Sequence, residues 1–327
     1  MQHRRLTRAE LAAETGISKP TVGESVRRLA EAGLVADTGE RTAGGRGRGR
    51  VGTYYALADV GAALVLSIAP EGITAEWVDA HGGTVSRAEQ GIGRPASPDQ
   101  VTAALLAVVI NAQQGSSVTP RLAVVSAADP VDRSTGRLIH LPDAPFLLGE
   151  LDPAEVLAPY VGGPVTVDND VNWAARAERD CAPAGTLRDF AYLYLDDGMG
   201  CAIVSDGEVR RGYGGLAGEV AHLITAGPQG RAMHFIDVFG ELGLRRAGST
   251  AIDAGRLLTA IGGSWGTHPL VLDAVTTAFT RMPRHVALRA AKLTAEPSLA
   301  GARADALDRL RLAIVAAARS ARRRGAL

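Results

Sequence analysis

The stretch Leu6-Thr-Arg-Ala-Glu-Leu-Ala-Ala-Glu-Thr-Gly-Ile-Ser-Lys-Pro-Thr-Val-Gly-Glu-Ser-Val-Arg-Arg-Leu29 decides the fold at the start of the chain. Thr7 followed three residues later by Glu10 is the capping-box pattern that begins a helix. Gly16 predicts a left-handed turn that ends this short helix. A second helical pattern follows directly, so the stretch predicts two helices joined by a tight turn.

The second helix is predicted to begin at Ser18 as its N-cap, with Pro20 in its first turn. Three apolar residues at helical spacing are predicted to face inward: Val22, Val26 and Leu29. This arrangement is a helix-turn-helix unit, whose second helix enters the major groove of DNA. The residues predicted to contact DNA from this helix are Ser18, Lys19, Thr21, Ser25 and Arg28. The alternative is an ordinary helical hairpin with a solvated polar face.

The residues after these helices predict the wing of a winged helix. Residues 32–35 lead into a short strand, and residues 51–57 are rich in β-forming side chains. Between them, glycine alternates with arginine, which lets the backbone lie close to a duplex. The predicted contacts to phosphates or to a narrow minor groove are Arg46, Arg48 and Arg50. A disordered basic linker is the alternative, and both hold if the loop orders only on DNA.

Composition and charge fit a DNA-binding globular protein. The first 50 residues hold ten Lys or Arg against six Asp or Glu, whereas the whole chain of 327 residues is neutral. A basic head on an acidic body favours a polyanionic partner, although the imbalance is small. No apolar run approaches the roughly 18 residues of a membrane span, so no membrane partner is expected. Cys181 and Cys201 lack metal-ligand spacing and favour a reduced, cytoplasmic setting.

The body of the chain shows two similar sets of strands and helices. Strands are predicted at residues 62–68, 73–78, 190–195 and 201–204. Asp79 and Asp206 each lead a tight turn into a further strand, and a helix is predicted after the first set at residues 98–114. Two repeats of strand hairpins followed by helices favour the duplicated fold of actin and the sugar kinases.

Two motifs make this assignment more specific. The run Asp168-Asn-Asp-Val-Asn-Trp-Ala-Ala-Arg-Ala-Glu178 resembles a signature of the ROK family (repressors, open reading frames and kinases), as does Gly207-Glu-Val-Arg-Arg-Gly-Tyr-Gly-Gly-Leu-Ala-Gly-Glu-Val-Ala-His222. Asp197-Gly-Met-Gly-Cys201 resembles its second phosphate loop. The resemblance implies an α/β protein with an N-terminal winged helix-turn-helix followed by an actin-like, sugar-kinase-like (ROK) two-lobed domain. The expected units are a head at residues 1–58 and a ROK domain at 59–327, with lobes at about 59–165 and 166–300 and a C-terminal helix at 302–324.

The resemblance also implies a sugar site. The residues that match the family's sugar-binding positions are Asn169, Asp170, Glu219, His222 and Glu241. Carboxylates, an amide and an imidazole can pair with sugar hydroxyls, which both donate and accept hydrogen bonds. Asp170 matches the general base of the kinases. The alternative for isolated members of this set is capping and loop structure.

The chain departs from the family at the zinc motif. Members carry Cys-x-Cys-Gly-x-x-Gly-Cys-x-Glu, and residues 232–241 place Ala232, His234 and Phe239 at the cysteine positions. A tetrahedral zinc site needs four ligands, and His222 with His234 supplies at most two, so we expect no metal. Apolar packing is expected to hold the loop instead, through Phe235, Val238 and Phe239.

The first phosphate loop is also altered. The kinases carry Asp-x-Gly-x-Thr, whereas this chain has Ser67-Ile-Ala-Pro-Glu-Gly-Ile73. Ser67 replaces the aspartate, and Glu71 adds negative charge where phosphate binds. We therefore expect no ATP binding, no catalytic residue and no cofactor. Asp170 is then expected to bind a hydroxyl without a phosphoryl donor.

The C-terminal part is shorter than the family pattern. Residues 251–261 begin like a helix and run into the glycine-rich segment 262–269, which resembles the turn near the adenosine of the kinases. The helices and the strand that the pattern has between them are expected to be absent.

Three functions fit these observations. The first is a transcriptional regulator that binds a double-stranded DNA operator under the control of a sugar or sugar derivative. It is expected to be a homodimer or homotetramer, because one head reads only a half-site. The second is a sugar kinase with an appended head, and the third is a regulator whose pocket is vestigial.

Overall fold

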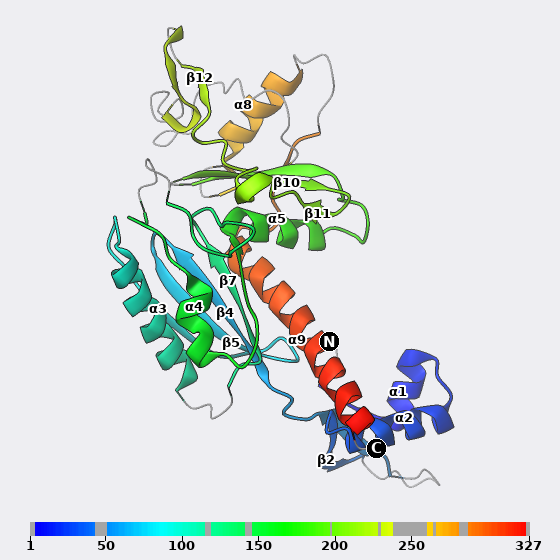
Figure 1. Ribbon diagram of the computed structural model, residues 1–327. Helices are drawn as coiled ribbons and strands as arrows, with labels where there is room; N and C mark the ends of the chain where they lie inside the picture. Colours follow the sequence, from blue (N-terminus) through cyan, green and yellow to red (C-terminus); the bar gives the residue numbers. More distant parts are fainter. Residues whose placement is uncertain are drawn as a thin grey trace.

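The N-terminal head contains the predicted pair of helices in the computed structural model of the chain (Figure 1). The structure describes residues 4–42, 51–114, 119–140, 146–196, 198–227, 230–237, 260–263, 266–280 and 287–324. Helix α1 (Arg8–Thr15) begins at the capping box of Thr7 and Glu10. Gly16 ends it in the left-handed conformation, with a φ of 68°. Both predicted boundaries of the first helix are confirmed.

Helix α2 (Lys19–Glu31) begins at the predicted N-cap Ser18, whose hydroxyl accepts a hydrogen bond from the backbone N–H of Thr21. Val22 and Val26 are buried as predicted. Leu29 was predicted to face inward and is 40% exposed, so that prediction was wrong.

Three antiparallel strands complete the winged helix. They are β1 (Arg5–Thr7), β2 (Val35–Arg41) and β3 (Thr53–Leu57), in the order β1-β3-β2. Strands β2 and β3 confirm the two predicted wing strands. The predicted DNA contacts in the loop between them lie outside the described residues: Arg46, Arg48 and Arg50.

The first lobe of the body is a mixed sheet with the order β6-β5-β4-β7-β8. Its strands are β4 (Ala62–Ala69), β5 (Gly72–Asp79), β6 (Thr84–Gln90), β7 (Leu122–Ala127) and β8 (Val165–Asn169). Strands β4, β5 and β6 pair antiparallel, and β7 and β8 run parallel to β4. Asp79 closes the β5–β6 turn, because its Oδ1 accepts hydrogen bonds from the N–H groups of His81 and Gly83. Strand β8 spans the expected boundary between the lobes and belongs to this sheet.

Alternate side chains of β4 explain why this sheet has a helix on each face. Leu64 lies in a buried cluster with α3 (Pro98–Gln113). The next side chain, Val65, points to the other face and lies in a second cluster with α9 (Pro297–Arg324). A strand buried on both faces reads as a continuous apolar run, as residues 62–68 do.

The second lobe repeats this plan with the strand order β11-β10-β9-β14-β15. The strands are β9 (Phe190–Leu195), β10 (Met199–Ser205), β11 (Glu208–Val209), β14 (Ala260–Gly262) and β15 (Arg289–Ala290). Tyr192 is buried against α5 (Asp170–Asp180), and Leu193 is buried against α8 (Pro269–Thr280). Two such lobes confirm the predicted actin-like, sugar-kinase-like α/β fold.

The structure corrects one expectation in the second lobe. Ala260 and Ile261 belong to β14, although a helix was predicted over residues 251–261 and a strand was expected to be missing here. Strand β14 pairs parallel with β9. Two apolar residues before two glycines fit a central strand as well as the end of a helix. Periodicity alone therefore could not distinguish the two structures here. Residues 251–259 lie outside the described part.

Short elements lie within each lobe, and one long helix links the body to the head. The short elements are α4 (Pro153–Leu157), β12 (Ile224–Ala226), β13 (Ala232–His234) and two 3₁₀ turns at Ala158–Tyr160 and Tyr213–Gly215. Helix α9 runs from the second lobe towards the head (Figure 1). Its Leu310 and Ile314 belong to the buried cluster on which Leu34 and Leu57 of the head pack. Across the described residues, no helix is both long and apolar enough to span a membrane.

Candidate functional site

A cavity of about 1150 Å³ is lined by residues of both lobes. The first lobe contributes the ends of β4 and β7, and the second lobe contributes the β9–β10 hairpin and part of the segment 219–237. Four of the predicted sugar-binding residues line this cavity: Asn169, Asp170, Glu219 and His222. The fifth, Glu241, lies outside the described residues. The structure thus brings together side chains that are up to 53 residues apart in the chain.

Asn169 caps helix α5 and links two strand ends. Its Oδ1 accepts a hydrogen bond from the N–H of Val171 at 3.0 Å. Its Nδ2 donates to the carbonyl oxygens of Ala127 and Asp129, each at 3.4 Å. Because the amide has two N–H donors, both are used, and a ligand hydroxyl can reach only Oδ1. The capping role is therefore present, and sugar binding by Asn169 stays a prediction.

Asp170 is the first residue of α5 and lies on the cavity wall. Its Oδ1 accepts a hydrogen bond from the N–H of Val171 at 2.7 Å. Burial, reinforced by the negative charges of Glu219 and Asp129, raises the pKa of Asp170 to about 7. A carboxyl group with a pKa near neutrality can either accept a hydroxyl proton or donate a hydrogen bond.

Glu219 and Asp129 share this environment. Burial raises the pKa of Glu219 to about 7, and the charge of Asp129 adds to the effect. Burial also raises the pKa of Asp129 to about 6, opposed in part by His140. Sequence reasoning did not single out Asp129. It stands two residues beyond the buried strand β7, and the carboxyl ends of such strands are where α/β proteins bind ligands.

Two histidines lie close together near the segment that corresponds to the family's zinc motif. The rings of His222 and His234 are 5.9 Å apart in an edge-to-face arrangement. His234 Nδ1 lies 3.8 Å from Oδ2 of Asp237. In the described part of the chain, no group of three or more His, Cys, Asp or Glu side chains is placed to hold a metal ion. Phe235 packs on a buried cluster of the second lobe, as predicted. The other two residues of the predicted packing lie outside the described residues: Val238 and Phe239.

The segment that corresponds to the first phosphate loop is a tight turn. Strands β4 and β5 pair as far as Ala69 and Gly72, which leaves only Pro70 and Glu71 between them. Arg94 donates to the carboxylate of Glu71 at 2.7 Å and to the carbonyl of Pro70 at 2.9 Å. A carboxylate at this turn disfavours a phosphate group there. The side chain that stands there is a carboxylate on the cavity wall.

The second phosphate loop corresponds to the β9–β10 hairpin. Gly198 and Gly200 line the cavity, while Asp197 lies outside the described residues. A Cβ atom at Gly200 would lie 2.4 Å from the side chain of Val171, so glycine lets the hairpin touch α5. Cys201 follows on the same wall, and burial raises the pKa of its thiol to about 11, which keeps it neutral.

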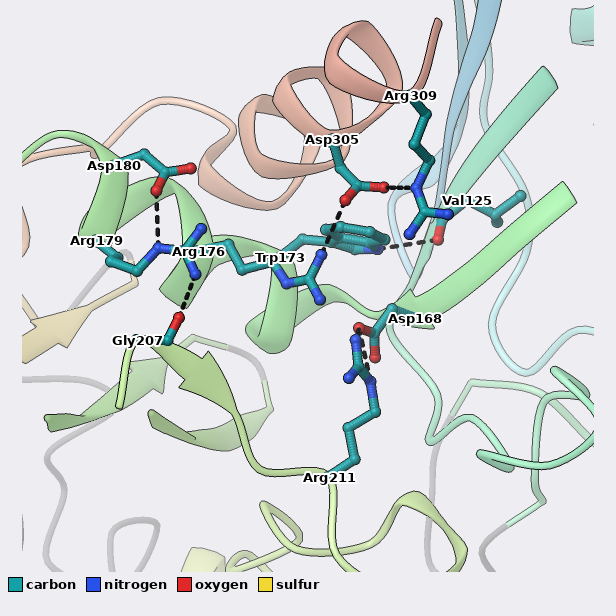
Figure 2. A network of polar contacts seen from close by, with 10 residues as sticks. All are labelled: Val125, Asp168, Trp173, Arg176, Arg179, Asp180, Gly207, Arg211, Asp305 and Arg309. Atoms are coloured by element: carbon teal, nitrogen blue, oxygen red, sulfur yellow. Dashed lines mark hydrogen bonds and ion pairs between the residues drawn. The ribbon is translucent and has the colours of Figure 1, made fainter. Parts of the chain in front are cut away.

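An ion pair ties the two family motifs together. Oδ2 of Asp168, which is 3% exposed, accepts hydrogen bonds from Nε of Arg211 at 3.0 Å and from its second nitrogen. Oδ1 of Asp168 accepts from Nδ2 of Asn172 at 2.9 Å and from the N–H of Asn169 at 3.0 Å. Figure 2 shows Arg211 reaching from the chain beyond Gly207 to Asp168. The pair therefore positions the start of α5, which carries Asn169 into the cavity wall.

A second group of contacts in Figure 2 holds α5 against α9 and the first sheet. Arg176 donates to Asp305 of α9 at 3.1 Å, and Asp305 also accepts from Arg309. The indole Nε1 of Trp173 donates to the carbonyl of Val125 at 3.0 Å. The guanidinium of Arg176 lies 4.7 Å from the Trp173 ring. Helix α5 is thus fixed on two sides.

The predicted DNA-contacting face of α2 is exposed. The residues concerned are Ser18, Lys19, Thr21, Ser25 and Arg28. Arg28 donates through Nε to Glu24 at 2.7 Å, and Arg27 also binds this carboxylate. Hydrogen bonds from Arg27 and Arg28 lower the pKa of Glu24 to about 2. Arg28 is thus paired with Glu24 in this structure, and DNA contact by this face stays a prediction.

Raising the pH is expected to destabilise the folded chain through the cavity carboxyl groups. Asp129, Asp170 and Glu219 have pKa values of about 6, 7 and 7, so the folded state holds protons that the unfolded state has lost. The free energy of unfolding should fall as the pH rises from about 5 to about 8. Asp129→Asn is expected to recover on the order of 2 kcal/mol at the higher pH, measured by urea unfolding. An equal fall in the variant would contradict the assignment.

A family model agrees with this geometry. The model of the ROK family matches residues 71–234, which is half of the chain. The chain belongs to the ROK family. A model of winged helix-turn-helix DNA-binding domains matches residues 1–36, ahead of the ROK domain.

Relatives of this ROK chain include kinases and repressors. A glucokinase of Streptomyces coelicolor is 28% identical over 165 residues, 50% of this chain and 50% of the kinase. A xylose repressor of Caldicellulosiruptor bescii is 39% identical over 59 residues, 18% of this chain and 15% of the repressor. The chain thus spans about half the length of the first curated relatives it matches, and less of others.

Solved structures show the same ROK fold. A ROK family transcriptional regulator, a homologue of the E. coli MLC protein, superposes with a TM-score of 0.60 at 16% identity over 95% of this chain and 94% of its own. A ROK family glucokinase from Streptomyces griseus, in complex with glucose and AMPPNP, gives a TM-score of 0.57 at 21% identity, over 75% of this chain and 99% of its own. At these identities the likeness establishes the fold alone.

Proposed function

We propose that this chain is a transcriptional regulator. Its head, residues 1–58, binds double-stranded DNA, and its ROK domain, residues 59–327, binds a sugar or sugar derivative without phosphorylating it. One observation carries the proposal: the cavity groups the sugar-side residues Asp170, Glu219 and His222, while the first phosphate loop is a two-residue turn bearing a carboxylate. These features support a site that binds a sugar and does not bind a nucleotide through its first phosphate loop.

Helix α9 offers a path from the cavity to the head. Ser298 and Leu299 at its start line the cavity. Leu310 and Ile314, farther along the same helix, share a buried cluster on which Leu57 of the head packs. We propose that a ligand which favours one placement of α9 shifts the head with it, because a helix transmits displacement along its axis. A homodimer or homotetramer would then present two heads to a two-part operator.

Fluorescence anisotropy with DNA from upstream of its own gene tests the proposal. We expect salt-sensitive, sequence-selective binding by the full chain, and a change in affinity on addition of one sugar from a panel. Selective binding that no sugar alters would contradict sugar control and leave DNA binding in place. Binding without sequence preference would contradict the regulator function at that site.

Lys19→Ala should weaken DNA binding through the loss of one phosphate contact. Lys19 is exposed at the first position of α2, where a recognition helix meets DNA. The slope of log affinity against log salt should fall by about one. Lys292→Ala is the matched control, because Lys292 is the other lysine of the chain and lies in the body. Equal losses in both variants would contradict the role of Lys19.

A sugar kinase with an appended head is the second candidate. It is favoured by Asp170, whose pKa of about 7 suits a general base that deprotonates a hydroxyl. A phosphate-release assay with ATP and the same sugar panel separates the two functions. Sugar-dependent turnover that Asp170→Asn abolishes would support the kinase and overturn the sensor.

A further inference from the structure

The cavity carries an excess of negative charge. Its described walls hold eight acidic side chains and two arginines, Arg87 and Arg94. Both arginines are already paired with carboxylates, three of them on the cavity wall and one outside it. The partners are Glu76, Glu89 and Glu296 for Arg87, and Glu71 for Arg94. Neither arginine pairs with Asp129, Asp170 or Glu219. The two arginines therefore do not neutralise these three carboxyl groups.

Of Asp129, Asp170 and Glu219, only Asp129 lies outside the motifs that predict sugar-hydroxyl binding. Its side chain is 3% exposed, and its Oδ2 has no hydrogen-bond partner among the described residues. A buried carboxylate without a partner is unfavourable, and a second carboxylate nearby makes it more so. Asp129 and Glu219 disfavour each other's charge, as the raised pKa of Glu219 reflects. A bound cation would satisfy the free oxygen and relieve this repulsion.

A protonated amine suits the cavity better than a metal ion. Within the described ranges, no three His, Cys, Asp or Glu side chains are placed to hold a metal. The volume of about 1150 Å³ is that of a small-molecule site. The same walls carry Oδ1 of Asn169 and the ring of His222, which suit hydroxyl groups. A polyhydroxylated ligand with an ammonium group can pair its charge with the carboxylates and its hydroxyls with these polar side chains.

We propose that the effector is an amino sugar or a similar polyhydroxylated amine, and that Asp129 binds its ammonium group. This inference rests on the proposed function, because it names the ligand class of the same site. The carboxylate of Asp129 on the cavity wall pairs with the ammonium, and Asp170 and Glu219 hold the neighbouring hydroxyls. A neutral sugar leaves Asp129 unpaired, so Asp129 is the residue that determines specificity.

Isothermal titration calorimetry with the full chain tests this inference. The probes are matched pairs that differ at one group: glucosamine with glucose, mannosamine with mannose, and galactosamine with galactose. We expect one amino sugar to bind at least about tenfold more tightly than its neutral partner. In Asp129→Asn the preference for the amino sugar should fall to about twofold or less.

Controls separate the outcomes. Asp308→Asn makes the same change on the exposed face of α9, outside the cavity, and should keep the preference. Asp129→Asn should unfold at no lower temperature, since it removes an unpaired charge. A neutral sugar that binds equally well, or a preference that persists in Asp129→Asn, overturns this inference alone. If no sugar binds, the inference fails together with sugar control. Binding of Mg²⁺ or Ca²⁺ alone that depends on Asp129 overturns it in favour of a metal site.

Discussion

Gly301→Ala is expected to destabilise the body of the protein by about 3 kcal/mol. Gly301 lies in α9 where this helix crosses α5, and a Cβ atom there would lie 2.0 Å from the backbone oxygen of Trp173. That oxygen cannot move independently, because it is part of α5 and the indole of Trp173 is anchored on Val125. The two helices must therefore separate to admit one methyl group. Alanine's higher helix propensity returns only about 1 kcal/mol.

Gly23→Ala is the matched control for this prediction. Gly23 is also helical, but a Cβ atom there meets nothing within 4 Å. The same substitution should therefore leave stability unchanged or raise it by up to about 1 kcal/mol. The three tryptophans, Trp77, Trp173 and Trp265, all lie in the body. Urea unfolding followed by tryptophan fluorescence for the body and by circular dichroism for the whole chain should show a lower midpoint for Gly301→Ala and an unchanged or slightly higher midpoint for Gly23→Ala. Equal midpoints in both variants would contradict the tight crossing.

Local signals in the sequence predicted the elements of the fold well. The capping box of Thr7 and Glu10, the N-cap Ser18 and the turn at Asp79 act within a few residues, so their hydrogen bonds can be read from the chain. The apolar runs of β4 and β9 likewise show burial directly. Leu29 and β14 were missed because burial there depends on what distant segments cover, which periodicity does not encode.

The candidate site was predictable only where a motif resembled the family. Asn169, Asp170, Glu219 and His222 were found in this way, and the structure gathers them on one cavity. Asp129 belongs to none of these motifs, and its approach to Glu219 depends on how the lobes face each other. The pairing of Asp168 with Arg211 spans 43 residues and is equally invisible to local patterns. Contacts that depend on tertiary geometry thus mark the limit of inference from one sequence.

Glu178→Gln is expected to cost about 3 kcal/mol and to weaken ligand binding. Glu178 of α5 is fully buried, and its Oε2 accepts hydrogen bonds from the N–H groups of Lys292 at 2.9 Å and Leu293 at 3.3 Å. Its Oε1 is paired with Arg289. Glutamine replaces one oxygen with an NH₂ group, which then faces either the arginine or two backbone donors. Two hydrogen-bond donors that face each other in a buried site cannot bond to each other, so both stay unsatisfied.

The effect should reach the cavity because Glu178 holds the segment that leads into α9. That segment places Thr294 and Glu296 on the cavity wall. Glu208→Gln, the same change at an exposed position of β11, should alter neither stability nor binding. Replacing both Glu178 and Arg289 with leucine should cost less than the sum of the single leucine variants, because neither charge is then left alone. Urea unfolding and calorimetry on the four proteins measure this coupling. Additive losses would show that Glu178 acts through its backbone contacts rather than through the ion pair.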